Sequence, residues 1–137
     1  MLLIREGTPL AKKRHRAASI KGKAHIYDTQ VKVMNSLKWF FAQQMREEGF
    51  LKIVEGPIKM KLVSYHPKPK SWSQKRLKEA EDQPVTTKPD VDNIFKLYSD
   101  VLNGIAYRDD SQISYLLVEK FYSDNPRVEI IIMPYKD

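Results

Sequence analysis

The chain has 137 residues, no cysteine, and 24 lysines and arginines against 17 aspartates and glutamates, which gives a formal net charge of +7. This length predicts one domain that buries roughly two thirds of its unfolded surface without a disulfide or a structural metal. The lack of cysteine excludes zinc fingers, thiol nucleophiles and disulfide frameworks. Arg5 and Glu6 interrupt the apolar N-terminal run too early for a signal peptide or a membrane span, so we expect a cytoplasmic location.

Positive charge is concentrated in one part of the chain. Residues 1–80 carry 18 basic and 6 acidic side chains, whereas residues 81–137 carry 6 basic and 11 acidic ones. A basic region of this size is typical of proteins that bind polyanions, because each lysine or arginine placed on a phosphate releases condensed counterions. The alternative is a solvated surface that only keeps the protein in solution. The charge balance favours a nucleic-acid partner.

The first elements predicted are a strand, a basic arm and a long helix. Residues 1–6 form an apolar run suited to a strand, and residues 7–27 indicate a long basic loop or arm because they lack apolar periodicity. A helix is predicted from its N-cap Asp28 to about Glu48, with Gly49 as the stop. Its core face is predicted to comprise Met34, Leu37, Phe41 and Met45, with Trp39 and Phe40 widening the apolar stripe as packing residues.

Residues 57–66 alternate between apolar and basic side chains, which predicts a half-buried strand with a basic outer face. A basic excursion over about residues 67–87 follows, and Ser71 or Ser73 is suited to cap a short helix extending towards Ala80. We interpret Trp72 as the anchor of this excursion in preference to a base-stacking group, and the lysines around it as phosphate contacts.

A second helix is predicted to begin near Asp90 or Val91 and to end at Asn103-Gly104. Two apolar and β-branched runs, 112–122 and 127–133, follow it and are joined by a turn-rich segment that indicates a β-hairpin. The second helix divides into an apolar face of Ile94, Leu97, Tyr98, Val101 and Leu102 and a polar face of Asp92, Lys96, Ser99 and Asn103.

The order of elements is β-α-β-(basic excursion)-α-β-β. This order predicts an α+β fold in which residues 1–137 form a single two-layer domain, a mixed β-sheet with helices on one face.

Four carboxylates lie at the two ends of the second predicted helix, in Asp90, Asp92, Asp109 and Asp110. Mg²⁺ prefers hard oxygen ligands, usually one or two carboxylates with waters and phosphate oxygens. Asp90 and Asp92 share a face only if the backbone between them is extended, so a shared site requires the helix to start at or after Asp92. The alternatives are helix capping by Asp90 or Asp92, an ion pair of Asp92 with Lys96, and a simple turn at Asp109-Asp110.

These residues also match a known pattern. The segments concerned are Pro89-Asp90-Val91-Asp92-Asn93, Lys96, Asp100, Leu102, Asn103-Gly104 and Asp109-Asp110-Ser111-Gln112. Together they closely resemble the signature of the RusA family of Holliday-junction resolvases. The resemblance extends to Lys12-Lys13-Arg14, Lys21-Gly22-Lys23, Tyr27-Asp28 and Lys70-Ser71-Trp72-Ser73, and the added segment 67–87 is similar to the longer phage and prophage branch.

The resemblance implies a homodimeric, Mg²⁺-dependent endodeoxyribonuclease that resolves four-way DNA junctions by paired symmetric nicks during recombination and repair, with Mn²⁺ as an alternative ion. It implies neither a small-molecule cofactor nor a membrane partner. The metal-binding aspartates of the family match Asp90, Asp92 and Asp110, with the adjacent Asp109 as an alternative third ligand. A lysine that the family needs for activity matches Lys96.

The candidate DNA contacts are basic residues of the arm, of the excursion and beside the aspartates. They are Lys12, Lys13, Arg14, Arg16, Lys21, Lys23, Lys68, Lys70, Lys75, Arg76, Lys88 and Arg108. Two other functions fit the charge distribution. One is a non-catalytic, basic nucleic-acid-binding module in which the aspartates only cap a helix, and the other is a structural protein whose basic surface meets an acidic protein.

Overall fold

The computed structural model describes residues 1–13 and 20–136, and between residues 20 and 29 it describes the backbone alone. The elements are β1 (Leu2–Glu6), α1 (Ile20–Glu47), β2 (Ile58–His66), α2 (Gln74–Glu79), α3 (Val91–Leu102), β3 (Ile113–Tyr122) and β4 (Arg127–Pro134), with a 3₁₀ turn at Asp110–Gln112 before β3. The expected α+β fold is confirmed.

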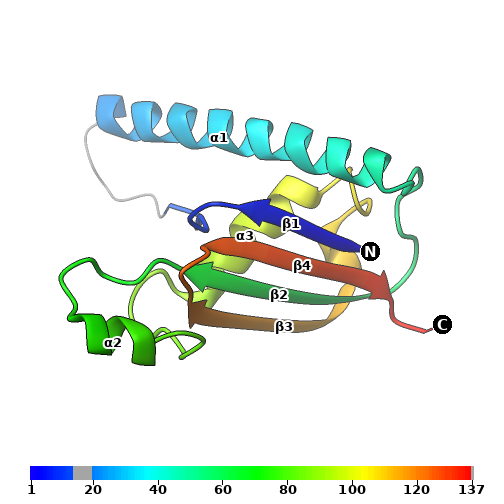
Figure 1. The fold of residues 1–137 in the computed structure, drawn as a ribbon. Coiled ribbons are helices and arrows are strands. Elements are labelled where there is room, and N and C mark those ends of the chain that lie inside the picture. The colour runs from blue at the N-terminus through cyan, green and yellow to red at the C-terminus, as the bar shows by residue number, and fades with distance from the viewer. Residues whose placement is uncertain (14–19, 137) are drawn as a thin grey trace.

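The four strands form one mixed sheet in the order β1-β4-β2-β3. β2 runs parallel to β3 and antiparallel to β4, and β1 pairs antiparallel with β4. Helix α3 crosses behind the sheet and α1 extends along the β1 side, while no described helix covers the face turned to the viewer in Figure 1. The core lies between the sheet and the two long helices, where Leu62, Ile130, Phe41 and Leu97 are almost fully buried.

The predicted β-hairpin of the last two strands is wrong, because β2 lies between β3 and β4. The connection passes the end of β2, where the backbone N–H of Ser123 donates to the carbonyl of His66 over 2.9 Å. Four residues, 123–126, are long enough to span the two strand spacings, about 10 Å in total. Alternation and turn residues indicate two antiparallel strands but do not report whether a third strand lies between them.

Helix α1 begins at Ile20, so Asp28 is inside it and is not its N-cap. The eight residues before Asp28, which we expected to belong to the arm, contain no proline and continue the helix. The other residues of the predicted arm divide between a described loop, 7–13, and positions 14–19 outside the described residues. The helix stops as predicted, with Gly49 in the left-handed region at φ +86°.

The predicted packing of α1 holds for its core face but not for Trp39. Leu37, Phe41 and Met45 are buried, and Met34 packs against them. Phe40 is partly buried and its ring meets that of Phe41 edge to face. Trp39 is 68% exposed, because two residues of helix turn the chain by about 200° away from Phe41. Its packing role was therefore predicted wrongly.

Helix α3 begins at Val91. A shared face for Asp90 and Asp92 requires a helix that starts at or after Asp92, so α3 starts one residue too early for it. Its apolar face is confirmed, since all five residues predicted for it are buried. Ser99, which we placed on the polar face, is also buried, and its hydroxyl donates to the carbonyl of Lys96 over 3.2 Å. The predicted end at Asn103-Gly104 is confirmed, with Gly104 at φ +78°.

The short helix of the basic excursion is α2, and Ser73 is its cap. The Ser73 hydroxyl accepts a hydrogen bond from the N–H of Arg76. Trp72 meets Tyr122 of β3 edge to face at 5.2 Å between ring centroids, which agrees with its interpretation as an anchor. In the part of the chain that the structure describes, no helix is long and apolar enough to cross a membrane.

Candidate active site at helix α3

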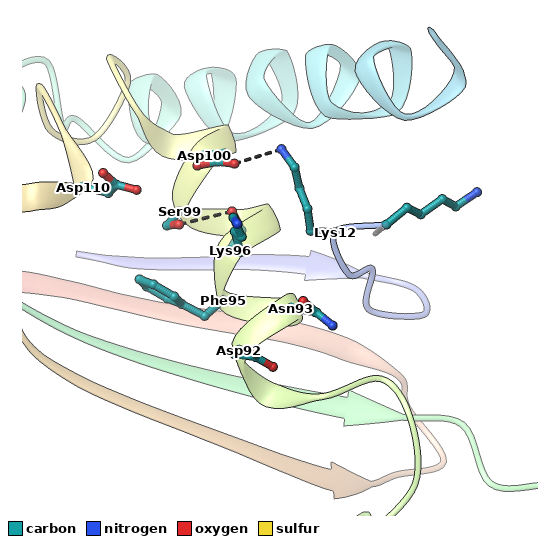
Figure 2. Close-up of a pocket in the computed structure, with 9 residues that line it drawn as sticks. Lys12, Asp92, Asn93, Phe95, Lys96, Ser99, Asp100 and Asp110 are labelled. Atoms are coloured by element: carbon teal, nitrogen blue, oxygen red, sulfur yellow. Dashed lines mark hydrogen bonds and ion pairs between the residues drawn. The ribbon is translucent and has the colours of Figure 1, made fainter. Parts of the chain in front are cut away.

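An open pocket of about 720 Å³ lies beside the polar side of α3. Figure 2 shows that its lining comes from three separate segments, which are α3, the loop after β1 and the 3₁₀ turn before β3. The lining combines acidic and basic groups, as a site for a metal ion and a phosphate requires. The residues are Lys12, Lys13, Asp92, Asn93, Phe95, Lys96, Ser99, Asp100 and Asp110.

The pocket brings together two of the three predicted metal ligands, Asp92 from the first turn of α3 and Asp110 from the 3₁₀ turn before β3. Asp90 lies just outside this lining, and its carboxylate accepts a hydrogen bond from the ammonium of Lys88 over 3.0 Å. No group of three acidic or histidine side chains among residues 1–13 and 30–136 is gathered closely enough to hold a metal ion. Asp90 occupies the N-cap position of α3, but its side chain makes no capping hydrogen bond.

Asp109 and Asp110 are adjacent but have different surroundings. The Asp109 carboxylate caps the 3₁₀ turn and accepts the N–H of Ser111 over 3.1 Å. Hydrogen bonds from Ser111 lower the pKa of Asp109. Asp110 makes no such capping bond and lines the pocket. Of the two adjacent aspartates, Asp110 is therefore the one that faces the pocket.

Gln112 fixes the turn that carries Asp110. Its amide oxygen accepts the N–H groups of Arg108 and Asp109 over 2.9 and 3.1 Å. Its amide nitrogen donates to the carbonyls of Val54 and Gly56 over 3.1 and 3.0 Å. One side chain thus ties the acidic turn to the loop before β2. Sequence reasoning included Gln112 in the pattern but gave it no task.

The loop after β1 is fastened to α3 next to the aspartates. The backbone N–H of Lys12 donates to the carbonyl of Asn93 over 2.9 Å, and the N–H of Leu10 donates to the hydroxyl of Tyr98 over 3.0 Å. The Lys12 ammonium also pairs with Asp100 over 2.9 Å (Figure 2). Asp100 is a pocket carboxylate without an expected role, and its spacing eight residues after Asp92 places it two helical turns further along α3.

Tyr107 lies fully buried beneath this acidic region. Its hydroxyl donates to the carbonyl of Ser99 over 2.8 Å. Burial raises the pKa of Tyr107, and the negative charges of Asp110, Asp100 and Asp109 raise it further. The phenol therefore stays protonated and serves as a fixed hydrogen-bond donor behind the pocket.

Comparison with known proteins decides the family. The family model described as Endodeoxyribonuclease RusA matches residues 6–133. The chain belongs to the RusA endodeoxyribonuclease family. It is also 42% identical over 131 residues to a Bacillus subtilis (strain 168) protein named Uncharacterized protein YqaN, a match that covers 92% of this chain and 90% of the relative. Crossover junction endodeoxyribonuclease rusA of Lactococcus phage r1t is 29% identical over 127 residues, covering 90% and 88%.

As a RusA family member, the chain is an endodeoxyribonuclease, a Holliday junction resolvase, and the family acts on branched DNA junctions. RusA resolvases generally depend on a divalent metal ion. This assignment favours the nuclease over the non-catalytic binding module.

The basic residues expected to contact DNA differ in how freely they can do so. Lys13, Lys70 and Lys75 are exposed, whereas Lys68 has a side chain only 4% exposed, between Glu81 at 2.8 Å and Asp124 at 3.0 Å. This burial disfavours a DNA contact by Lys68. Three of the others form ion pairs, Lys12 with Asp100, Lys88 with Asp90 and Arg108 with Glu55, and Arg76 stacks on Trp72.

Four expected DNA contacts lie outside what the structure describes. For Lys21 and Lys23 only the backbone is described, and Arg14 and Arg16 are not described at all.

Proposed function

We propose that this RusA family member is a homodimeric, Mg²⁺-dependent resolvase that makes paired symmetric nicks in four-way DNA junctions during recombination and repair. The observation that carries the proposal is the pocket beside α3, where Asp92 and Asp110 face a space that is flanked by Lys12, Lys13 and Lys96. Carboxylates for a metal and ammonium groups for phosphates therefore share one concave surface, as cleavage of a phosphodiester demands.

The donor set fits a hard divalent cation. Asp92 and Asp110 are carboxylates in an open, water-accessible pocket, and Asp90 directly precedes α3. We assign metal binding to these three aspartates, with Mg²⁺ as the ion and Mn²⁺ as its substitute. When bound, such an ion polarises the scissile phosphate, lowers the pKa of a water molecule and offsets charge on the leaving oxygen.

The basic side chains of the pocket serve the phosphate. Lys96 is exposed on α3, one helical turn after Asp92. Both residues belong to the described part of the chain, and there they form no ion pair with each other. The Lys96 ammonium is therefore available for the negative charge that develops on the scissile phosphate. Exposed Lys13 and its neighbours along the arm would hold the backbone of the DNA on either side.

The dimer gives the second active site that a symmetric cut needs. We assign its interface to the sheet face opposite α1 and α3. In the register of the sheet, Leu117, Lys61 and Ile131 lie side by side in one row of that face, and Glu119, Val63 and Glu129 form the next row. A twofold axis across the strands between these rows brings the Lys61 of each copy onto the two glutamates of the other. The face is therefore self-complementary in charge as well as apolar.

Substituting Leu117→Lys tests this interface. Leu117 is 39% exposed, and the change places a second cation beside Lys61. Wild type is expected to sediment as a dimer and Leu117→Lys as a monomer. Leu51→Lys is the matched control, because Leu51 is 79% exposed in the loop after α1, away from the sheet. A wild-type monomer, or a Leu117→Lys dimer as stable as wild type, would contradict the assignment.

Asp92→Asn tests the active site. The change is nearly isosteric and removes one metal-binding charge, so cleavage of a synthetic four-way junction in Mg²⁺ should fall by at least about 100-fold, on the order of the loss of one essential electrostatic group. Junction affinity in EDTA should be unchanged or higher. Asp82→Asn, an exposed aspartate in the loop after α2, is the control and should cleave like wild type. Full cleavage by Asp92→Asn would overturn the site, and binding without metal-dependent cleavage by wild type would return the aspartates to a capping role.

A further inference from the structure

Lys120 of β3 reaches from the sheet to the segment that leads into α3. Its ammonium donates to the carbonyl of Thr87 over 2.7 Å and to the carbonyl of Pro89 over 2.9 Å. Asp90 follows Pro89 directly and is the N-cap residue of α3. A single half-buried side chain thus holds two of the three carbonyls that precede the first aspartate of the site.

The backbone before this point is fixed in a different way. Residues 82–85 run along the free edge of β3, where the N–H of Asp82 donates to the carbonyl of Tyr122 and the N–H of Val85 to the carbonyl of Lys120. These edge bonds end at Val85. From Thr87 to Pro89 the Lys120 ammonium continues the attachment of this segment to the sheet, up to the residue before Asp90.

The buried polar neighbours of Lys120 on β2 are Ser64 and His66. In the sheet register Lys120 lies next to Ser64, whose hydroxyl is 2.6 Å from Nε2 of His66. Both of these side chains are buried. Burial lowers the pKa of His66 and the nearby Lys120 charge lowers it further, so the imidazole is neutral at neutral pH. The two buried polar side chains of β2 nearest to Lys120 are therefore uncharged.

We propose that Lys120 is a positioning residue for the metal site: it holds the Thr87 and Pro89 carbonyls and so fixes the backbone from which the Asp90 carboxylate joins Asp92 and Asp110 in binding the ion. The proposal rests on the proposed function for the metal-binding role of Asp90. Lys120 itself touches neither DNA nor metal. Loss of the Lys120 ammonium is expected to weaken metal affinity and to leave junction affinity unchanged. Mutation of a group that orients a metal ligand typically lowers metal affinity or activity by about 10–100-fold.

Lys120→Met is the test, since it keeps the length and apolar stem of the side chain and removes its donors. The Mg²⁺ concentration that gives half-maximal junction cleavage should rise by about 10-fold or more, while junction affinity in EDTA stays at the wild-type value. Calorimetric titration of the DNA-free protein with Mn²⁺ should show the same weakening. Lys52→Met, an exposed lysine in the loop after α1, is the matched control and should behave like wild type.

Hydrogen exchange gives a readout that needs neither metal nor activity. In Lys120→Met the amides of residues 87–93 should exchange faster than in wild type, whereas those of β2 and β4 should be unchanged. Lys120→Arg keeps a cationic donor and should recover most of the Mn²⁺ affinity. Lys120→Gln, which removes the ammonium and is too short to reach both carbonyls, replaces Lys120→Met in the comparison with wild type if the latter fails to fold. Wild-type Mn²⁺ affinity and wild-type exchange in a folded Lys120 variant without the two hydrogen bonds would overturn the proposal.

The outcomes separate this proposal from the proposed function. If wild type neither cleaves junctions nor binds Mn²⁺, the proposed function fails, and the positioning role in a metal site fails with it even where exchange at residues 87–93 quickens. If wild type cleaves and binds Mn²⁺ but the Lys120 variant that lacks the two hydrogen bonds does the same with unchanged constants, the proposed function stands and only the role of Lys120 is refuted.

Discussion

Lys68 and Lys13 carry the same charge and both come from basic stretches, yet they have different surroundings. Lys68 is enclosed between Glu81 and Asp124, and its charge is used inside the fold. Lys13 is exposed at the rim of the pocket. The sequence predicts both as DNA contacts, because the density of positive charge is local information. The acidic partners of Lys68 are brought to it by the folding of distant segments, which charge patterning does not report.

The Lys68–Glu81 pair predicts a pH dependence of stability. The hydrogen bond from Lys68 lowers the pKa of Glu81 below its ordinary value. A lowered folded-state pKa stabilises the protein fully above the unfolded value, about 4.3, and this contribution is lost as the pH falls through the folded value. Glu81→Gln should therefore lower the Tm at pH 7 and have a smaller effect near pH 3. Thermal unfolding followed by circular dichroism measures both.

Glu48→Gln, an exposed glutamate just after α1, is the control for that measurement and should change the Tm little at either pH. A Tm difference between Glu81→Gln and wild type that stays the same from pH 7 to pH 3 would show that the Glu81 charge has no part in stability.

At the scale of elements, the two long helices were predictable and the order of the strands was not. The apolar spacing of α3 defined its buried face because a helix is set by residues three and four positions apart. The arrangement of β3 and β4 depends instead on β2, which lies almost fifty residues before β3 in the chain and enters between them. No local pattern in the last two runs contains that information.

Helix α1 offers a direct test of which of its aromatic residues belong to the core. Phe41 is fully buried, and truncation to Ala should cost about 3–5 kcal/mol of unfolding free energy. Trp39 is 68% exposed, so Trp39→Ala should stay within about 0.5 kcal/mol of wild type. Urea unfolding of the two variants measures the difference. Equal losses for Phe41→Ala and Trp39→Ala would contradict the orientation of the helix.

At the scale of the whole molecule, the fold gathers the site from segments that are far apart in sequence. The sheet and α3 bring the loop after β1, the N-terminal end of α3 and the turn at Asp110 to one pocket. The sequence identified the aspartates and Lys96 through their resemblance to a family pattern. The sequence did not indicate the hydrogen bonds that hold these segments in place. The amide of Gln112 and the ammonium of Lys120 bind backbone carbonyls, which every residue has, so the type of the partner residue does not reveal them.

Paired, metal-dependent cutting of a four-way junction is the activity that we propose for the whole molecule. The most direct measurement maps the cleavage positions on all four labelled strands of a synthetic junction, with Mg²⁺ and with EDTA, beside a linear duplex of the same sequence. We expect nicks at matched positions in two opposed strands, present only with Mg²⁺ and absent from the duplex. Cleavage of the duplex at a similar rate, or unpaired nicks that persist in EDTA, would contradict the account.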